Sequence, residues 1–229
     1  MILALDTTSR ICTVALASDQ GVMAEFSLGI ARAHSRWLIP ALSNLLDDTG
    51  VKVEALDAIA VTTGPGSFTG LRIGVTTAKM LAYVWQLPVC PMGTLEVLSQ
   101  GVMTPEIISP VVMARKGEVY AALYHKDCLK QPHVVGEGEW LNYLQSLERP
   151  IVVVGDALER GELFSQEELG GQVEAAPMSL RYPRAAVVAQ LGWEAFRQGR
   201  GIEPMLVTAS YLKKSQAEVM RERKLAQEE

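Results

Sequence analysis

The segment that decides the fold opens the chain, where residues 2–29 read ILALDTTSRICTVALASDQGVMAEFSLG. The apolar residues 2–7 are typical of a buried strand, and residues 11–18 and 21–29 have the composition of two more. Asp19-Gln20-Gly21 supplies the turn between the last two. The sequence therefore predicts that the chain begins with a three-stranded antiparallel meander.

Alternating helices and strands are expected to follow this meander. In the first of them Leu38, Leu42 and Leu45 recur at helical spacing, and Gly50 supplies a C-terminal cap. The expected ranges are a helix at 35–49, a strand at 57–63, a helix at 67–86, a strand at 89–92 and a helix at 94–102. The resulting order, β-β-β-α-β-α-β-α, is the layout of one lobe in actin-like, sugar-kinase and Hsp70 proteins.

A weaker copy of the same order is expected in the second half of the chain. Its first hairpin turns at Arg115-Lys116-Gly117. The expected ranges are strands at 107–114, 118–125, 134–135 and 151–154, and helices at 140–147, 159–169, 183–198 and 210–224. We therefore predict an α/β, actin-like ATPase fold with two lobes, the second one reduced. The expected domains are an N-terminal lobe at 1–104, a second lobe at 105–182, and C-terminal helices at 183–229, the last of which packs back on the first lobe.

Composition and charge narrow the function classes. The chain has 229 residues and a formal net charge of −5, whereas a protein that binds nucleic acid by itself usually shows a basic face. Its basic residues concentrate near the C-terminus but are mixed with Glu, which favours a solvated helix and leaves any role with RNA to a partner. The three cysteines form no CxxC pair and predict neither a disulfide framework nor a zinc cluster. A signal peptide and a membrane span are not recognisable, so we expect a cytoplasmic protein without membrane contact.

Asp6-Thr7-Thr8, at the end of the first strand, has two interpretations. In actin-like ATPases this hairpin cradles phosphate, and its carboxylate orients metal-bound water. A polar turn whose side chains bond their own backbone fits the residues equally well. The second lobe has Met113, whose thioether does not bind Mg²⁺, where the matching Asp is expected, and Gly155-Asp156-Ala157 in place of an adenosine-binding glycine pair. The sequence favours the layout of an ATPase without its chemistry, so we expect no cofactor.

The turn Gly64-Pro65-Gly66-Ser67-Phe68-Thr69-Gly70 is the most distinctive stretch. It is not a P-loop, since no Gly-Lys-Ser/Thr follows, and Thr69 stands where the dinucleotide fingerprint has its third glycine. Beyond it, Gly70, Gly74 and Ala78 form a stripe of small residues at helical spacing. A glycine inside a helix costs roughly 1 kcal/mol relative to alanine, so a close backbone approach is expected to offset it. The spacing leaves open whether the stripe packs on its own sheet or on a helix of another chain.

Histidine usage argues against a metal-dependent enzyme. The chain has three histidines, His34, His125 and His133. An HxxxH metal site needs a second ligand four residues on, and Leu38 stands there after His34. No GxSxG motif and no recognisable Cys-His constellation are present either. We expect neither a metal site nor a catalytic residue.

Taken together, the motifs resemble the bacterial TsaB (YeaZ) family over nearly the whole chain. The block GPGSFTGLRIG at 64–74 is the most specific part of the resemblance. The residues that match family motifs are Asp6, Thr7, His34, Gly64, Pro65, Gly66, Ser67, Phe68, Thr69, Arg72, Arg115, Glu118 and Tyr120, with Tyr211 and Leu212 near the C-terminus. The chain departs from the pattern at Met113, where the family often has Asp, and at Ala209, where it tends to Pro.

The resemblance implies a non-catalytic subunit in the biosynthesis of tRNA threonylcarbamoyladenosine. TsaB proteins pair with TsaD, the transferase that acts on the adenosine beside the anticodon, and the ATPase TsaE joins the assembly. In the family this pairing uses the first two helices of the N-terminal lobe, and TsaB alone often forms homodimers through a related surface. For this chain the resemblance implies contacts from the helices at 35–49 and 67–86, with tRNA reached only through the complex. The expected contact residues are Trp37, Ala41, Leu45, Gly70, Gly74 and Ala78.

Two other classes of function compete with this interpretation. A small-molecule kinase or ATPase of the same fold would also use Asp6-Thr7-Thr8 and the two-lobed layout. A glycoprotease-like metallopeptidase is disfavoured, because the HxxxH pattern is missing.

Overall fold

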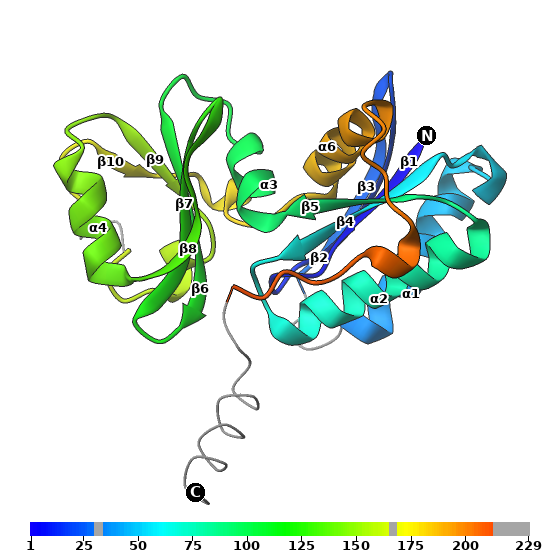
Figure 1. The fold of residues 1–229 in the computed structure, drawn as a ribbon, viewed down its shortest axis with the longest axis horizontal. Helices are drawn as coiled ribbons and strands as arrows, with labels where there is room; N and C mark the ends of the chain where they lie inside the picture. The colour runs from blue at the N-terminus through cyan, green and yellow to red at the C-terminus, as the bar shows by residue number, and fades with distance from the viewer. Residues whose placement is uncertain (30–33, 165–168, 213–229) are drawn as a thin grey trace, which may run out of the picture.

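Two lobes, each built on a five-stranded sheet, make up the computed structural model, which describes residues 1–29, 34–164 and 169–212 (Figure 1). In the first sheet the order is β3-β2-β1-β4-β5, with β1, β2 and β3 antiparallel and β4 and β5 parallel to β1. Its strands are β1 (Ile2–Asp6), β2 (Cys12–Ser18), β3 (Gly21–Leu28), β4 (Ala58–Gly64) and β5 (Val89–Gly93). The meander and the two later strands of this lobe are confirmed.

The second sheet repeats the same topology with different residues. Its order is β10-β9-β6-β7-β8, with β6, β7 and β8 antiparallel and β9 and β10 parallel to β6. The strands are β6 (Ile107–Arg115), β7 (Glu118–His125), β8 (Asp127–Gly136), β9 (Ile151–Val154) and β10 (Val173–Ala175). Two sheets with the same strand order, each with helices between its later strands, form the actin-like fold that the element order predicted.

Strand alternation places the helices of the first lobe on opposite faces of its sheet. Leu3 and Leu5 belong to the apolar cluster under α1 (His34–Thr49) and α2 (Phe68–Trp85). Ile2 and Ala4 point the other way, toward α6 (Ala185–Arg197). Gly192 allows α6 to lie very close to the sheet, since a Cβ there would stand 2.4 Å from the Cβ of Ala60. Figure 1 shows α6 on one side of this sheet and α1 and α2 on the other.

A short helix, α3 (Thr94–Gln100), lies between the lobes (Figure 1). Its Leu95 and Leu98 belong to an apolar cluster with Ile108, Val112 and other residues of the second sheet. Val97 instead packs with the first lobe, in the cluster that contains α6. The remaining helices are α4 (Glu137–Ser146) and α5 (Ala157–Arg160), with 3₁₀ turns at Val53–Ala55, Met178–Leu180 and Pro204–Leu206. No helix among the described residues is both long and apolar enough to cross a membrane.

Several predicted elements of the second half differ from the structure. The helix expected at 159–169 ends early: α5 stops at Arg160 and residues 161–164 are not helical, because the carboxylate of the distant Glu137 accepts the backbone N–H groups of Glu162 and Leu163 and replaces the next helical bonds. Residues 165–168 of that range lie outside the described residues. The strand expected at 134–135 is the end of the much longer β8, and the short β10 was not expected. The helix expected at 210–224 lies outside the described residues except for 210–212, which are not helical.

Candidate functional site

Asp6 is a fully buried carboxylate at the end of β1. Its Oδ1 accepts the backbone N–H of Thr8 at 3.2 Å, and its Oδ2 accepts the hydroxyls of Thr8, at 2.8 Å, and of Thr62 on β4. Burial raises the pKa of Asp6 to about 6, against the opposing effect of these hydrogen bonds. Both carboxylate oxygens are occupied by the chain itself, so of the two interpretations the structure shows the polar turn.

The hairpin after β1 receives the glycine turn and the start of α2. Thr8 C=O accepts the N–H of Ser67 at 2.7 Å, and the Thr7 hydroxyl donates to Gly70 C=O at 2.7 Å. The Ser67 hydroxyl accepts the Gly70 N–H at 3.2 Å and caps the helix. A Cβ on Gly70 would stand 1.9 Å from the carbonyl oxygen of Thr7. Glycine is therefore required there by close contact with the hairpin that follows β1 of the same chain.

The stripe of small residues on α2 faces the sheet of its own lobe. A Cβ on Gly74 would meet the Thr7 hydroxyl at 2.4 Å, and Ala78 is fully buried. On α1, Ala41 and Leu45 are likewise buried in the apolar cluster of the lobe. These four residues and Gly70 are covered by the fold of their own lobe, which does not support their expected contact with another chain. Trp37 is the member of the predicted contact set that is exposed.

Other apolar side chains take the outer positions of the same two helices. Trp37 and Ile39 on α1 are 37% and 51% exposed. On α2 the exposed large apolar residues are Met80, Tyr83 and Val84. Contacts between α1 and α2 place the two helices side by side on one face of the first sheet. The sequence contained this signal in the helical periodicity, since these residues alternate with the buried ones.

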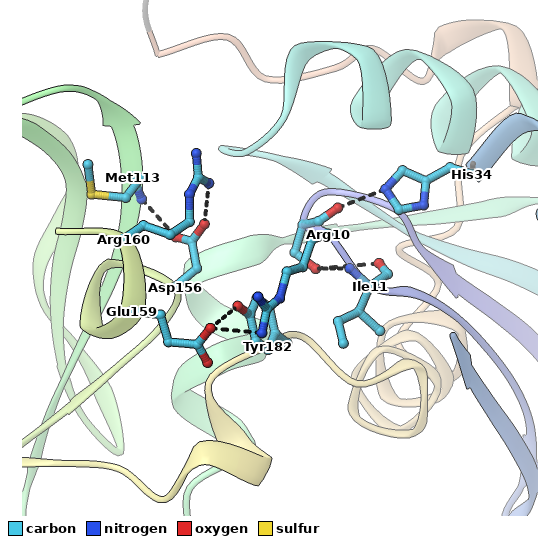
Figure 2. Close-up of polar contacts among 9 residues, drawn as sticks. Arg10, Ile11, His34, Met113, Asp156, Glu159, Arg160 and Tyr182 are labelled. Carbon is cyan, nitrogen blue, oxygen red and sulfur yellow. Dashed lines mark hydrogen bonds and ion pairs between the residues drawn. The ribbon is translucent and has the colours of Figure 1, made fainter. Parts of the chain in front are cut away.

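The second hairpin is organised around Asp156 rather than around a ligand of its own. Asp156 is buried, and its Oδ1 accepts the backbone N–H of Met113 at 2.8 Å while its Oδ2 pairs with Arg160 at 2.6 Å (Figure 2). A Cβ on Gly155 would lie 2.0 Å from Val111 C=O, so β6 and the turn after β9 are in direct backbone contact. The nucleotide and Mg²⁺ of actin-like ATPases do not fit these residues, because Asp6 and Asp156 are buried and paired within the chain and Met113 offers no oxygen.

Arg10 connects the two lobes. Its guanidinium pairs with Glu159 Oε2 at 2.8 Å and lies 4.8 Å from the ring centroid of Tyr182 (Figure 2). The Tyr182 hydroxyl donates to the same oxygen at 2.8 Å, and burial together with this carboxylate raises the pKa of Tyr182. These three residues are missing from the sequence prediction, because nothing in the local pattern signals contacts between residues so far apart in the chain.

The basic residues beside the second hairpin are also paired. Arg115 makes a bidentate contact with Glu118 at 2.8 and 2.9 Å, and Lys116 pairs with Glu162 at 3.1 Å. Tyr120, the remaining motif residue of this hairpin, is partly buried on β7. The motif residues Arg115 and Glu118 therefore bind each other within the hairpin, and Lys116 links the hairpin to Glu162.

His34 begins α1 and binds the first hairpin. One ring nitrogen, Nε2, lies 2.9 Å from Ser9 C=O, and the side chain is nine-tenths buried. Within the described part of the chain no group of three or more His, Cys, Asp and Glu residues is placed to hold a metal ion. The contact of His34 is that of a packing residue which fixes the entry of α1.

The C-terminal motif lies against the start of α2. Ser210 N–H donates to Thr63 C=O at 2.7 Å, and the ring of Tyr211 is 5.1 Å from that of Phe68. Arg72 stacks on Phe68, with its guanidinium 4.1 Å from the centroid of the Phe68 ring. Farther along α2, Lys79 donates to the carbonyls of Met205 and Val207. The motifs at 64–74 and 211–212 are therefore neighbours in space.

A cavity of about 280 Å³ opens between the lobes next to this segment. Gly64, Pro65 and Gly93 from the first sheet and Tyr124 and Cys128 from the second are among the residues that line it. Cys128 is half-buried, and no ion pair of the described residues reaches into this space.

Comparison with known proteins identifies relatives of this fold. The model of the TsaD family, described as tRNA N6-adenosine threonylcarbamoyltransferase, matches residues 13–138. Two solved structures of YeaZ-type proteins from Pseudomonas aeruginosa are 27% identical, with TM-scores of 0.76, and are covered over 99% of their length by 93% and 92% of this chain. The fold and these matches define a two-lobed, actin-like protein related to the threonylcarbamoyltransferases.

Closer relatives give the family itself. The tRNA threonylcarbamoyladenosine biosynthesis protein TsaB of Bacillus subtilis (strain 168) is 34% identical over 199 residues, which span 84% of this chain and 87% of that protein. TsaB of Escherichia coli (strain K12) is 35% identical over 160 residues, or 61% of this chain and 69% of that protein. The chain belongs to the TsaB family.

Proposed function

We propose that this chain is a non-catalytic subunit in the formation of threonylcarbamoyladenosine beside the anticodon of tRNA, and that it acts by binding a TsaD-like transferase. The relatives that support this proposal are named for tRNA threonylcarbamoyladenosine biosynthesis. The observation that carries it is the set of apolar side chains exposed on α1 and α2, hereafter the outer face: Trp37, Ile39, Met80, Tyr83 and Val84. Exposed apolar groups of this size on adjacent helices favour a protein partner.

The internal use of the motif side chains supports a role without catalysis. Asp6 is a hydrogen-bonded hub, His34 binds a backbone carbonyl, and Asp156 holds Met113 in place. A general base or metal ligand must reach the substrate or the metal, whereas these three side chains are buried and contact groups of the chain itself. The transfer reaction would then take place on the partner.

The match to the TsaD family model bears on the kind of partner. Residues 13–138 contain α1 and α2, so a transferase of that family carries a related pair of helices. Two related helix pairs can combine in a bundle of four helices with a small-to-medium apolar seam. The same outer face would close a homodimer when the chain is alone. In the complex, TsaE would join this pair, and tRNA would be reached only through the assembly, in keeping with the net charge of −5.

The outer face can be tested by co-purification with the cognate TsaD. We expect Tyr83→Glu combined with Val84→Glu to abolish the complex, because two charges would be buried in an apolar seam. Leu129→Glu, an equally exposed apolar residue on β8 of the second lobe, is the matched control and should leave the complex intact. Threonylcarbamoylation of tRNA by TsaD and TsaE should depend on formation of this complex. We therefore expect the activity to be lost with the double variant and kept with Leu129→Glu.

Two results would contradict the proposal. A complex that survives the double variant would remove the outer face as the docking surface. Modification of tRNA at the full rate by TsaD and TsaE without this chain would remove the role itself. The melting temperature of each variant, which should equal that of the parent because the side chains are exposed, separates both results from a folding defect.

A further inference from the structure

The two lobes are joined at two places that differ in chemistry. The first is α3, whose Leu95 and Leu98 are buried among Val112, Tyr124 and other residues of the second sheet. Because Val97 of the same helix packs with the first lobe, α3 is an apolar wedge shared by both. Rotation of one lobe against the other would expose part of this cluster, which resists motion at that end.

The second junction is polar and centres on one carboxylate oxygen. Glu159 Oε2, on α5 of the second lobe, lies 2.8 Å from the Arg10 guanidinium and 2.8 Å from the Tyr182 hydroxyl (Figure 2). Arg10 belongs to the hairpin between β1 and β2 of the first lobe, and its guanidinium also stacks on the Tyr182 ring. Glu159 is mostly shielded from water, with 17% of its side chain exposed, which strengthens both contacts.

The connecting segment is held to both lobes. Tyr182 is fixed to Glu159 of the second lobe, and Arg184, two residues later, pairs with Glu25 on β3 of the first. Glu25 also accepts the backbone N–H of Ala186 at 3.0 Å and so caps α6. Among the ion pairs of the described residues, the one that joins the body of the first lobe to the body of the second is that of Arg10.

We propose that Arg10 is a positioning residue that latches the two lobes at one angle through Glu159 and Tyr182. Arg10 lies in the hairpin that contains Thr7 and Thr8, so the latch joins this hairpin to α5. A single exposed ion pair contributes little free energy. Here an ion pair, a hydrogen bond and a cation–ring contact share the same three side chains, so each contact restricts the side chains that form the others. With the α3 wedge, the latch makes the chain a rigid body rather than a hinge that opens and closes.

The angle between the lobes can be measured on the isolated chain by double electron–electron resonance. Spin labels would be placed at Gln20→Cys in the β2–β3 turn and Gln145→Cys on α4, both exposed. Cys128→Ser removes the half-buried thiol, and Cys12 and Cys90 are buried. Dilution with unlabelled protein limits the signal to distances within one chain, whatever its oligomeric state.

We expect one narrow distance distribution in the parent and a broadened or shifted one in Arg10→Ala. Arg160→Ala is the matched control: this arginine is equally exposed and ion-paired, but its partner Asp156 belongs to the same lobe. Its distribution should coincide with that of the parent. Arg10→Lys keeps the charge and loses the flat group that stacks on Tyr182, and should give an intermediate width.

If the distance distribution of Arg10→Ala coincided with that of the parent, the proposed role of Arg10 would be wrong. The angle between the lobes would then be held without the contacts of Arg10. An equal broadening in Arg160→Ala would also overturn it, because the effect would then follow the loss of any arginine in the cleft. Arg10 is more than half exposed, so both alanine variants should fold, which circular dichroism can verify. The measurement involves no partner, so its outcome is independent of the proposed binding to TsaD.

Discussion

The carboxylate of Asp6 is buried, so its charge, when ionised, is not solvated by water. The carboxylate receives three hydrogen bonds from Thr8 and Thr62 and none of its surface is exposed. Because those donors are neutral, they compensate the loss of hydration only in part, and the proton is held to higher pH than in the unfolded chain. Asp6, for which the sequence left a phosphate hairpin and a polar turn equally open, thus ties β1 to β4.

This burial makes stability depend on pH in a defined direction. The pKa of Asp6 is about 6 in the folded chain and 3.8 as the ordinary value, so its contribution to stability is fully present below about pH 4 and is lost as pH rises through 6. A difference of about two pKa units corresponds to about 3 kcal/mol. Asp6→Asn, which can keep the contact with Thr8 N–H, should remove this part of the pH dependence of the unfolding free energy, measured in urea between pH 4 and 7.

A matched variant separates this effect from the general titration of the protein. Asp19→Asn changes an exposed carboxylate in the β2–β3 turn and should retain the pH profile of the parent. If Asp6→Asn and the parent lost the same free energy over this range, the buried carboxylate would not be the group that titrates.

At the scale of elements, the close contact between α2 and β1 explains the glycines of the most distinctive motif. Gly66 and Gly70 lie against backbone atoms of Thr8 and Thr7, and Gly74 lies against the Thr7 side chain. The stripe therefore serves the packing of a helix on its own sheet. For the same reason a bulky residue at Gly74 would disturb the fold before it reported on a partner, and the outer face is the better place to test docking.

Gly70→Ala should destabilise the chain although alanine favours helices. The added Cβ would overlap the Thr7 carbonyl, and relief requires a shift of α2 or β1, which typically costs about 1–3 kcal/mol. Thr76→Ala on the exposed side of the same helix is the control and should be neutral or slightly stabilising. Urea unfolding monitored by circular dichroism measures both. Equal stability of Gly70→Ala and the parent would show that the contact with β1 is not tight.

At the scale of the whole molecule, the same strand order occurs twice without a repeated sequence. In nucleotide-binding proteins of this layout, chemistry takes place between the lobes. Here the ionic groups that meet in the cleft bind one another: Arg10 pairs with Glu159, and Asp156 with Arg160. The architecture is retained while its charged groups serve to hold the chain together.

Isothermal titration of the isolated chain with Mg-ATP should therefore give no saturable heat. Phosphate binding would require free cations or open backbone donors at the two hairpins, and Met113 cannot replace a metal-binding carboxylate. The same titration into an active ATPase of this fold is the positive control. Saturable binding with turnover would favour the kinase or ATPase alternative over the role of a subunit.

Much of this molecule could be predicted locally. The periodicity of residues 2–93 is strong, so the meander, α1 and α2 were located to within one or two residues. Prediction was weaker after residue 125, where β8 is long and irregular and Glu137 ends α5 through contacts with Glu162 and Leu163. Such contacts join residues remote in sequence, and a local pattern contains no trace of them.

The sequence alone determined the element order, the family motifs and the spacing of small residues along α2, because these depend on neighbours in the chain. The tertiary structure decided what that spacing is for, since only the position of β1 shows that Thr7 fills the space at Gly70. It also decided that Asp6 is a buried hub and that Arg10 reaches Glu159 across the cleft. Burial and long-range pairing arise only when elements distant in the sequence pack together. The contribution of a charged group or a glycine to stability depends on the atoms that surround it in the folded chain.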